Sequence, residues 1–263
     1  MTIDGLFELE ELKQELISAL NYEVADIEEV VEEAFVKVVN IALRSREEEE
    51  SLDIRDNAVL GYKNAPELKF PNEVLRVISR AFENKGLVSV DTNKCRVVGE
   101  NAFSNNKINS LIIEGVEEIL NGAFENNCLV NVSFSNNLRL IRERAFKDNK
   151  IKELIIPDSV QIVDSCSFYC NEIERVLIGK GIVRIFEGTF ALNKLRNIVI
   201  PDTIRAIDYK SFWDNPIDVI KIGTNVKVDR YAFDNALFSE CYENNEREGG
   251  VYSFDGKVWI KVG

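Results

Sequence analysis

The chain has 263 residues, of which 45 are acidic and 32 are basic, giving a net charge of −13, and it contains no histidine. The lack of histidine removes the Ser-His-Asp and Cys-His nucleophile systems and most zinc sites, so we expect no enzyme, no catalytic residues, no metal site and no cofactor. The acidic excess leaves no basic patch that could follow a phosphate backbone, so we expect no nucleic-acid partner.

The acidic charge is concentrated at the N-terminal end, where the sequence predicts helices. Residues 1–66 hold 17 acidic and 6 basic side chains, whereas the remainder holds 28 acidic and 26 basic. Leucines recur at helical spacing in the first 20 residues, and a second apolar stripe begins at Ile27. We predict an acidic helical hairpin over residues 1–46 and an acidic connector over residues 47–66. Three roles are open to the hairpin: covering the first unit of the repeat that follows, self-association, or docking on a partner helix.

Phenylalanine recurs every 21 or 22 residues through most of the remaining chain, which is the signature of a solenoid. The residues eight and ten positions after it are apolar in nearly every copy and share one face of an extended segment. We predict about eight coils over residues 67–241, each with a short strand, a turn and a return arm that carries the phenylalanine into the core. The eight phenylalanines are Phe82, Phe103, Phe124, Phe146, Phe168, Phe190, Phe212 and Phe233.

An asparagine stands three residues after the phenylalanine in six of the eight copies. A repeated asparagine at a turn can bond backbone groups that would otherwise lack partners, and it tolerates left-handed backbone geometry. We favour this structural role over a metal or ligand ladder. The six residues are Asn106, Asn127, Asn149, Asn171, Asn193 and Asn215.

The copy over residues 151–168 reads IKELIIPDSVQIVDSCSF, a leucine- and isoleucine-rich strand followed by an aliphatic arm and the phenylalanine. This pattern resembles the BspA-type leucine-rich repeats, and the resemblance extends over roughly residues 67–241. It implies a right-handed, curved solenoid with a parallel sheet on its concave face. It also implies adhesion or protein binding, often at bacterial or protist surfaces, and it supplies no catalytic motif.

The end of the chain predicts a β-hairpin. Two alternating runs flank the dipeptide Asp255-Gly256, which is a strong hairpin turn signal. We expect residues 242–263 to cover the last coil with Tyr252, Phe254 and Trp259, and a ligand-binding aromatic cluster is the alternative. The predicted fold class is therefore α+β: a leucine-rich repeat solenoid between an N-terminal helical hairpin and a C-terminal β-hairpin cap.

A candidate binding surface follows from strand alternation. The residue nine positions after each phenylalanine should point away from the core, and this column is apolar in four coils. The column seven positions after the phenylalanine supplies polar neighbours. The candidate partner-binding residues on the concave face are Ile112, Glu153, Ile155, Arg175, Leu177, Asn197, Val199 and Lys221.

These features favour a non-catalytic protein–protein interaction module that binds a protein through the concave sheet face, the N-terminal helices or both. The alternatives are an assembly component that self-associates through residues 1–46 and a surface adhesin, the latter implied only by the resemblance. The first residues lack the pattern of a signal peptide, and no apolar run is long enough to span a membrane, which predicts a cytoplasmic protein. The resemblance implies a surface or released location instead. Five cysteines without C-x-x-C spacing predict reduced thiols.

Overall fold

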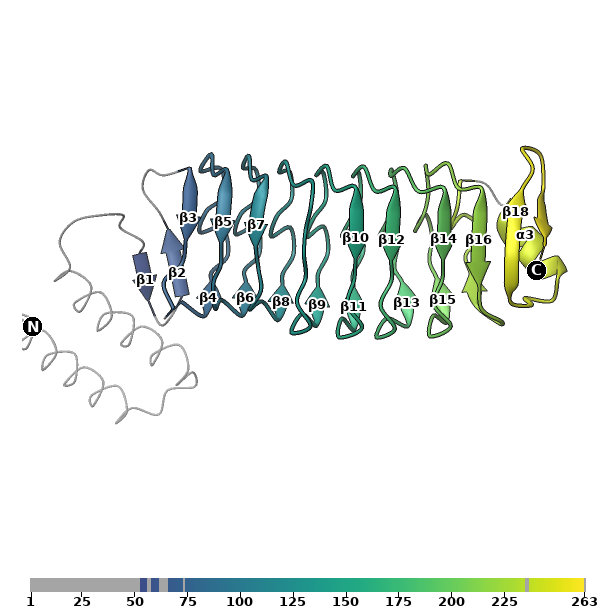
Figure 1. Cartoon of the computed structure of the whole chain (residues 1–263), viewed down its shortest axis with the longest axis horizontal. Helices are drawn as coiled ribbons and strands as arrows, with labels where there is room; N and C mark the ends of the chain where they lie inside the picture. Colours follow the sequence, from purple (N-terminus) through teal and green to yellow (C-terminus); the bar gives the residue numbers. More distant parts are fainter. Residues whose placement is uncertain (1–52, 56–57, 62–65, 73, 235–236, 263) are drawn as a thin grey trace, which may run out of the picture.

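The computed structural model describes residues 53–55, 58–61, 66–72, 74–234 and 237–262. These residues form a β-solenoid with little helix, in which coils of about 22 residues stack one on the next (Figure 1). The eight phenylalanines are separated by seven complete turns, so the solenoid has about seven turns rather than eight. The helical hairpin predicted over residues 1–46 lies outside the described residues.

One row of parallel strands lies where the sequence predicts it, seven to nine positions after each phenylalanine. Side chains alternate between buried and exposed in these strands, for example exposed Glu153, buried Leu154 and exposed Ile155. The coil between β7 and β10 contributes only a single bridge, from Asn131 to Glu153. The strands are β3 (Glu67–Lys69), β5 (Ser89–Asp91), β7 (Ser110–Ile112), β10 (Glu153–Ile155), β12 (Arg175–Leu177), β14 (Asn197–Val199) and β16 (Val219–Ile222).

A second row of two-residue parallel strands runs through the return arms, which the sequence analysis treats as arms without strands. In each strand the second residue is buried beside the phenylalanine spine, as Val163 is in β11. The strands are β4 (Arg76–Val77), β6 (Val97–Val98), β8 (Glu118–Ile119), β9 (Leu140–Ile141), β11 (Ile162–Val163), β13 (Arg184–Ile185), β15 (Ala206–Ile207) and β17 (Lys227–Val228).

Two further strands extend the second row within the segment that the sequence analysis treats as a connector. They are β1 (Asp53–Arg55) and β2 (Ala58–Gly61), which pair with each other antiparallel. β2 also pairs parallel with β4, so the sheet continues beyond the first repeat. These two strands lie within residues 47–66, the range predicted as a connector.

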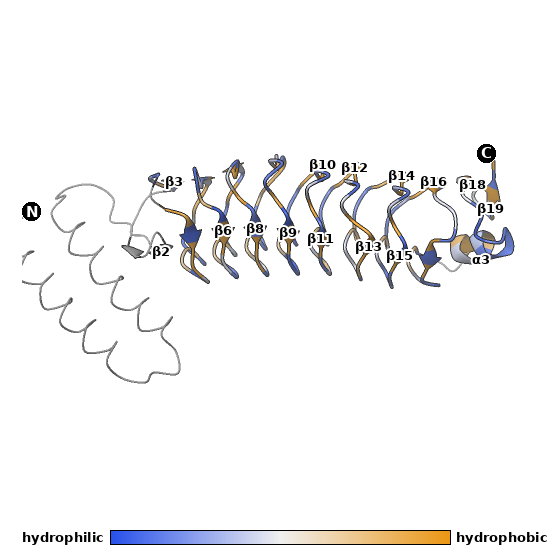
Figure 2. Ribbon diagram, turned by 90° about the horizontal axis from the view of Figure 1, so that it is seen from below, coloured by the Kyte–Doolittle hydropathy of each residue, from blue (hydrophilic) through white to orange (hydrophobic). Residues whose placement is uncertain are grey.

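The coils stack along a nearly straight axis in both views, unlike the curved solenoid that the resemblance implies (Figures 1 and 2). Both rows consist of parallel strands that are hydrogen-bonded from coil to coil except between β7 and β10, β11 and β13, and β12 and β14, and such strands keep a spacing of about 4.8 Å. Because the two rows advance by the same distance per coil, neither side of the stack becomes longer than the other. We therefore call the outward surface of the β3–β16 row the strand face, rather than a concave face.

The phenylalanines form a continuous spine in the core. Successive ring centroids from Phe82 to Phe233 are 5.1–5.9 Å apart, and successive ring planes differ by no more than 16°. The rings are offset-stacked because the coil repeat sets their spacing. A small residue precedes each ring, such as buried Ala102 before Phe103, and leaves room for the arm to pack closely.

The asparagine column is a structural turn ladder, as the sequence predicts. Each of the six asparagines is buried, and its amide group bonds the backbone of its own coil and of the coil before it. The left-handed residues are not these asparagines but the ones immediately before them, including Asn105 at φ 56° and Leu192 at φ 56°. The asparagine side chain therefore satisfies turn backbone groups, while its neighbour makes the left-handed turn.

The C-terminal end closes the stack with a helix and a hairpin. The hairpin of β18 (Gly250–Phe254) and β19 (Trp259–Lys261) is present, and β18 pairs antiparallel with β16. Before it lies α3 (Leu237–Asn244), a helix that the sequence analysis does not predict because it assigns Phe238 to the last coil. Phe238 instead packs edge-on against Phe233, with ring centroids 4.9 Å apart, and against Trp259, at 5.2 Å.

The buried tyrosines of this cap make the stability of the fold sensitive to alkaline pH. Burial raises the pKa of Tyr252 to about 12, from 10.0 for an exposed tyrosine. Because the pKa is higher in the folded state, this stabilising contribution is complete below pH 10 and is lost as the pH rises through about 12. We expect the free energy of unfolding to fall over this interval and to fall less in Tyr252→Phe. Urea titrations followed by circular dichroism measure this, and identical pH dependence in the two proteins would contradict it.

Candidate functional site

The strand face presents the apolar column that the sequence predicts. The side chains of Ile155, Leu177 and Val199 are 63%, 64% and 55% exposed, respectively. The alternate residues of the same strands, Leu154, Val176 and Ile198, lie in the core. These exposed apolar side chains are therefore not part of the packing that holds the coils together.

Strand register brings the three side chains into one row. Ile155 lies directly opposite Leu177, and Val199 lies directly opposite Lys221. β14 follows β12 in the stack (Figure 1) and contacts it without strand hydrogen bonds, and Val199 holds the same position in β14 that Leu177 holds in β12. We call Ile155, Leu177 and Val199 the apolar stripe; at about 4.8 Å per coil it is roughly 10 Å long from end to end.

Ile112 does not join this stripe, although its side chain is also exposed. It lies on β7 opposite Asp91, and the coil between it and Ile155 carries exposed Ser133 at the equivalent position. The structure therefore brings seven of the eight candidate residues together and leaves Ile112 apart.

The polar candidates form the border of the apolar stripe. Glu153 lies opposite Arg175 on the adjacent strand, and their side chains form an exposed ion pair. Asn197 follows in the same row and lies opposite Val219. An exposed ion pair of this kind adds little to stability, so its groups remain available to a polar partner.

Charges near the strand face are mostly balanced between neighbouring coils. The Lys194 ammonium lies 2.9 Å from the Glu172 carboxylate, and the Arg196 guanidinium lies 3.1 Å from the Asp218 carboxylate. Lys221, at the end of the apolar stripe, forms no ion pair with another residue in the part of the chain that the structure describes. The surface around the stripe is thus close to neutral.

The sequence analysis missed a continuation of this surface onto the C-terminal hairpin. Val251 lies opposite Lys221, and the Val262 amide donates to the Val251 carbonyl oxygen at 2.8 Å. Directly opposite residues of antiparallel strands point to the same side of a sheet. Val262 and Ile260 are 56% and 47% exposed, so the exposed apolar surface extends past Lys221. Their alternation in the sequence was the available signal, but it gives no information about which sheet the hairpin joins.

The described residues include free thiols but no cluster of metal-binding side chains. No group of three or more metal-binding side chains occurs within them. The five cysteines are free, and burial raises the pKa of Cys95 to about 11. Cys166 and Cys170, on either side of Phe168, are both in left-handed turns, and desolvation raises the pKa of each. The thiols of Cys95, Cys166 and Cys170 are therefore largely protonated near neutral pH.

The repeats of this solenoid match the model of a known protein family. The model of the BspA type leucine rich repeat region, in six copies, matches residues 27–151 and 117–241. The chain belongs to this family. No helix in the described part of the chain has the length and apolar character needed to cross a membrane.

Two solved structures are similar in part to this BspA-type leucine-rich repeat protein. One is a leucine-rich repeat protein from Bacteroides ovatus ATCC 8483, with 17% identity and a TM-score of 0.39 over 65% of this chain and 62% of that chain. The other is a leucine rich cell surface protein from Faecalibacterium prausnitzii A2-165, with 13% identity and a TM-score of 0.32 over 69% of this chain and 90% of that chain. The match therefore spans less than two thirds of the Bacteroides chain. No curated protein matches this sequence significantly.

Proposed function

We propose that this BspA-type leucine-rich repeat protein is a non-catalytic module that binds a protein partner through the strand face. The observation that carries the proposal is the apolar stripe of Ile155, Leu177 and Val199, exposed in three consecutive coils. Singly exposed apolar residues are common on protein surfaces, whereas contiguous ones mark interaction sites. Membership of a leucine-rich repeat family supports protein binding as the function.

The apolar stripe and its polar border fit a partner segment that carries apolar side chains with polar groups beside them. The row of Ile155, Leu177 and Val199 supplies area that a partner can remove from water. Glu153 and Arg175 lie in the adjacent row, where they can exchange their mutual ion pair for contacts to the partner. The coil backbone is held by two hydrogen-bonded rows, so little conformational entropy is lost when the partner binds.

We expect a charge placed in the stripe to abolish partner binding. Leu177→Asp introduces a carboxylate that must be desolvated without a partner charge, which costs several kcal/mol. The matched control is Val183→Asp, because Val183 belongs to the same coil, is 57% exposed and lies directly before β13 in the second row, away from the strand face. Affinity capture from source cells with the wild type and both variants measures the effect.

The proposal predicts a protein that is captured by the wild type and by Val183→Asp but not by Leu177→Asp. Equal capture by all three proteins would remove the strand face as the binding surface. Loss of capture only when residues 1–46 are deleted would assign binding to that segment instead.

The alternative of an assembly component also rests on residues 1–46, with their leucines at helical spacing. Light scattering of the full chain and of residues 47–263 separates the two functions. A change from oligomer to monomer on deletion favours assembly, whereas a monomer in both forms excludes it. The adhesin alternative requires export, which fractionation of source cells tests.

A further inference from the structure

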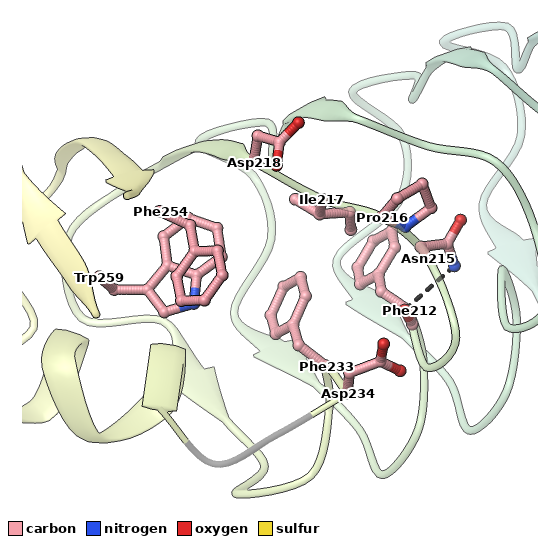
Figure 3. Close-up of a pocket in the computed structure, with 9 residues that line it drawn as sticks. All are labelled: Phe212, Asn215, Pro216, Ile217, Asp218, Phe233, Asp234, Phe254 and Trp259. Carbon is pink, nitrogen blue, oxygen red and sulfur yellow. Dashed lines mark hydrogen bonds between the residues drawn. The ribbon is translucent and has the colours of Figure 1, made fainter. Parts of the chain in front are cut away.

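A cavity of about 190 Å³ lies where the repeat ends and the C-terminal cap begins. Its lining comes from the last coils and from the hairpin, as Figure 3 shows. The residues that matter for its chemistry are Phe212, Phe233, Phe254, Trp259, Asp218 and Asp234.

The cavity follows from the end of the asparagine ladder. In an earlier coil the Ile173 amide donates to the side-chain oxygen of Asn193 in the next coil, at 3.0 Å. The equivalent position in the last coil is Ala236 in the sequence, so it has no amide group to offer. The Ile217 amide instead donates to the Asn215 carbonyl oxygen, at 2.8 Å. The turn after Asn215 thus differs from the earlier turns in the acceptor of its backbone amide.

Aromatic rings form two sides of the cavity. Phe212 and Phe233 stack with ring centroids 5.2 Å apart, at the end of the spine. Phe254 and Trp259 of the hairpin lie with ring centroids 5.4 Å apart and planes tilted by 36°. Figure 3 shows the two pairs on different sides of the space. Phe190 and Phe233 cover the two faces of Phe212, and Phe238 packs against both Phe233 and Trp259. The rings therefore offer the cavity apolar contact surface, which suits the aliphatic part of a long side chain.

Two carboxylates flank the rings from opposite sides of the cavity (Figure 3). Asp218 is neutralised by Arg196, whose guanidinium lies 3.1 Å away. Asp234 accepts a hydrogen bond from the Asp214 amide, and the charged group that acts on it is Asp214, which has the same sign. No ion pair to Asp234 occurs among the described residues. Asp234 is an exposed residue, so its negative charge is available to a partner at the edge of the cavity, and partial desolvation raises the pKa of its carboxyl group.

We propose that this cavity binds the side chain of a lysine or arginine from a peptide or protein. The aliphatic part of such a side chain would contact the rings, and its cationic end would pair with Asp234. An anion would be repelled by Asp234 and Asp214, and an uncharged apolar group would shield part of the Asp234 carboxylate from water without pairing with it. A cavity of about 150 Å³ is known to hold benzene, so the space is sufficient for an alkylammonium or alkylguanidinium group.

This inference goes beyond the proposed function and does not depend on it. The cavity is bounded by residues of the last coils and of the hairpin, and none of the residues of the apolar stripe lines it. Leu177→Asp tests binding at the strand face, and Asp234→Asn tests binding in the cavity. A negative result for one proposal therefore does not bear on the other.

Titration of the full chain with blocked amino acids tests the inference. The probes are N-acetyl-lysine methylamide, N-acetyl-arginine methylamide and the uncharged N-acetyl-norleucine methylamide, with butylammonium as a free amine. Trp213→Phe makes Trp259, in the cavity wall, the single remaining tryptophan for fluorescence. The charge is removed with Asp234→Asn, and Asp202→Asn is the control because Asp202 is exposed beside Gly223, at the other end of β16 from Asp218.

We expect the lysine and arginine probes to bind saturably, and about tenfold more weakly in Asp234→Asn, with no change in Asp202→Asn. Norleucine binding as tight as lysine binding would show an apolar pocket and overturn the inference. Equal affinity in the Asp234→Asn variant, or no binding by any probe, would also overturn it. Butylammonium binding that exceeds binding of both blocked amino acids would assign the site to free amines rather than to a protein side chain.

Discussion

Phe168→Ala lowers the free energy of unfolding by about 3–5 kcal/mol, as expected for removing a large ring from a packed core. Phe168 is fully buried, and its ring stacks between Phe146, with a centroid separation of 5.4 Å, and Phe190, at 5.9 Å. The loss should be large because the coils on both sides are fixed by hydrogen-bonded strands and cannot collapse into the space. Urea unfolding followed by circular dichroism measures it.

The control for this change is Tyr169→Ala, the adjacent aromatic residue, which is only partly buried. It should cost far less than the loss of Phe168, because less of its surface is removed from water in the folded state. Each coil of a solenoid contacts only its neighbours, so a weakened coil can uncouple the unfolding of the two halves. We therefore expect Phe168→Ala to broaden the urea unfolding transition as well. Equal destabilisation by the two variants would contradict the role of the spine.

Asn193→Ala is expected to lower the free energy of unfolding by about 2–4 kcal/mol, although it removes few atoms. The side-chain oxygen accepts from the Ile173 amide at 3.0 Å. The side-chain nitrogen donates to the carbonyl oxygens of Phe168, Phe190 and Ala191, at 3.0, 3.0 and 3.1 Å. Alanine leaves these buried backbone groups without partners in two coils, which is more costly than losing a single exposed hydrogen bond.

Asn193→Asp separates the two halves of this interaction. The carboxylate can still accept from the Ile173 amide, but it cannot donate to the three carbonyl oxygens and is repelled by them. We expect it to be at least as destabilising as alanine at neutral pH. Asn109→Ala, at an exposed asparagine, is the control and should have almost no effect. Chemical unfolding that gave equal stability for Asn193→Ala and Asn109→Ala would contradict the structural ladder.

The features that could be predicted from the sequence are those that recur once in every coil, at the 21- or 22-residue spacing of the phenylalanines. Alternation places Leu154 inside and Ile155 outside, and the same offsets then place Leu177 and Val199. The spine and the asparagine ladder follow for the same reason, because one residue type returns to one environment in every coil. The candidate site was predicted as a column, and its placement on one face depended only on this alternation.

The features that could not be predicted have no periodic signal of their own. The second-row strands are two residues long, as in β11, which is too short to show alternation. Phe238 occupies the position of an apolar coil residue, although its spacing of four from Tyr242 also fits the buried face of a helix. The straight axis depends on equal spacing in both rows, and the cavity depends on a coil that does not follow. Both are properties of the assembled stack rather than of any one repeat.

Site-specific photocrosslinking tests the central claim, binding of a protein through the strand face, most directly. Benzoylphenylalanine is placed at Leu177 in the apolar stripe and, in a second protein, at Val183 on the same coil. After irradiation in source cells, we expect one crosslinked protein that depends on position 177 and is lost when Ile155→Asp is added. Crosslinks of equal intensity from both positions, or from position 183 alone, would contradict binding through this face.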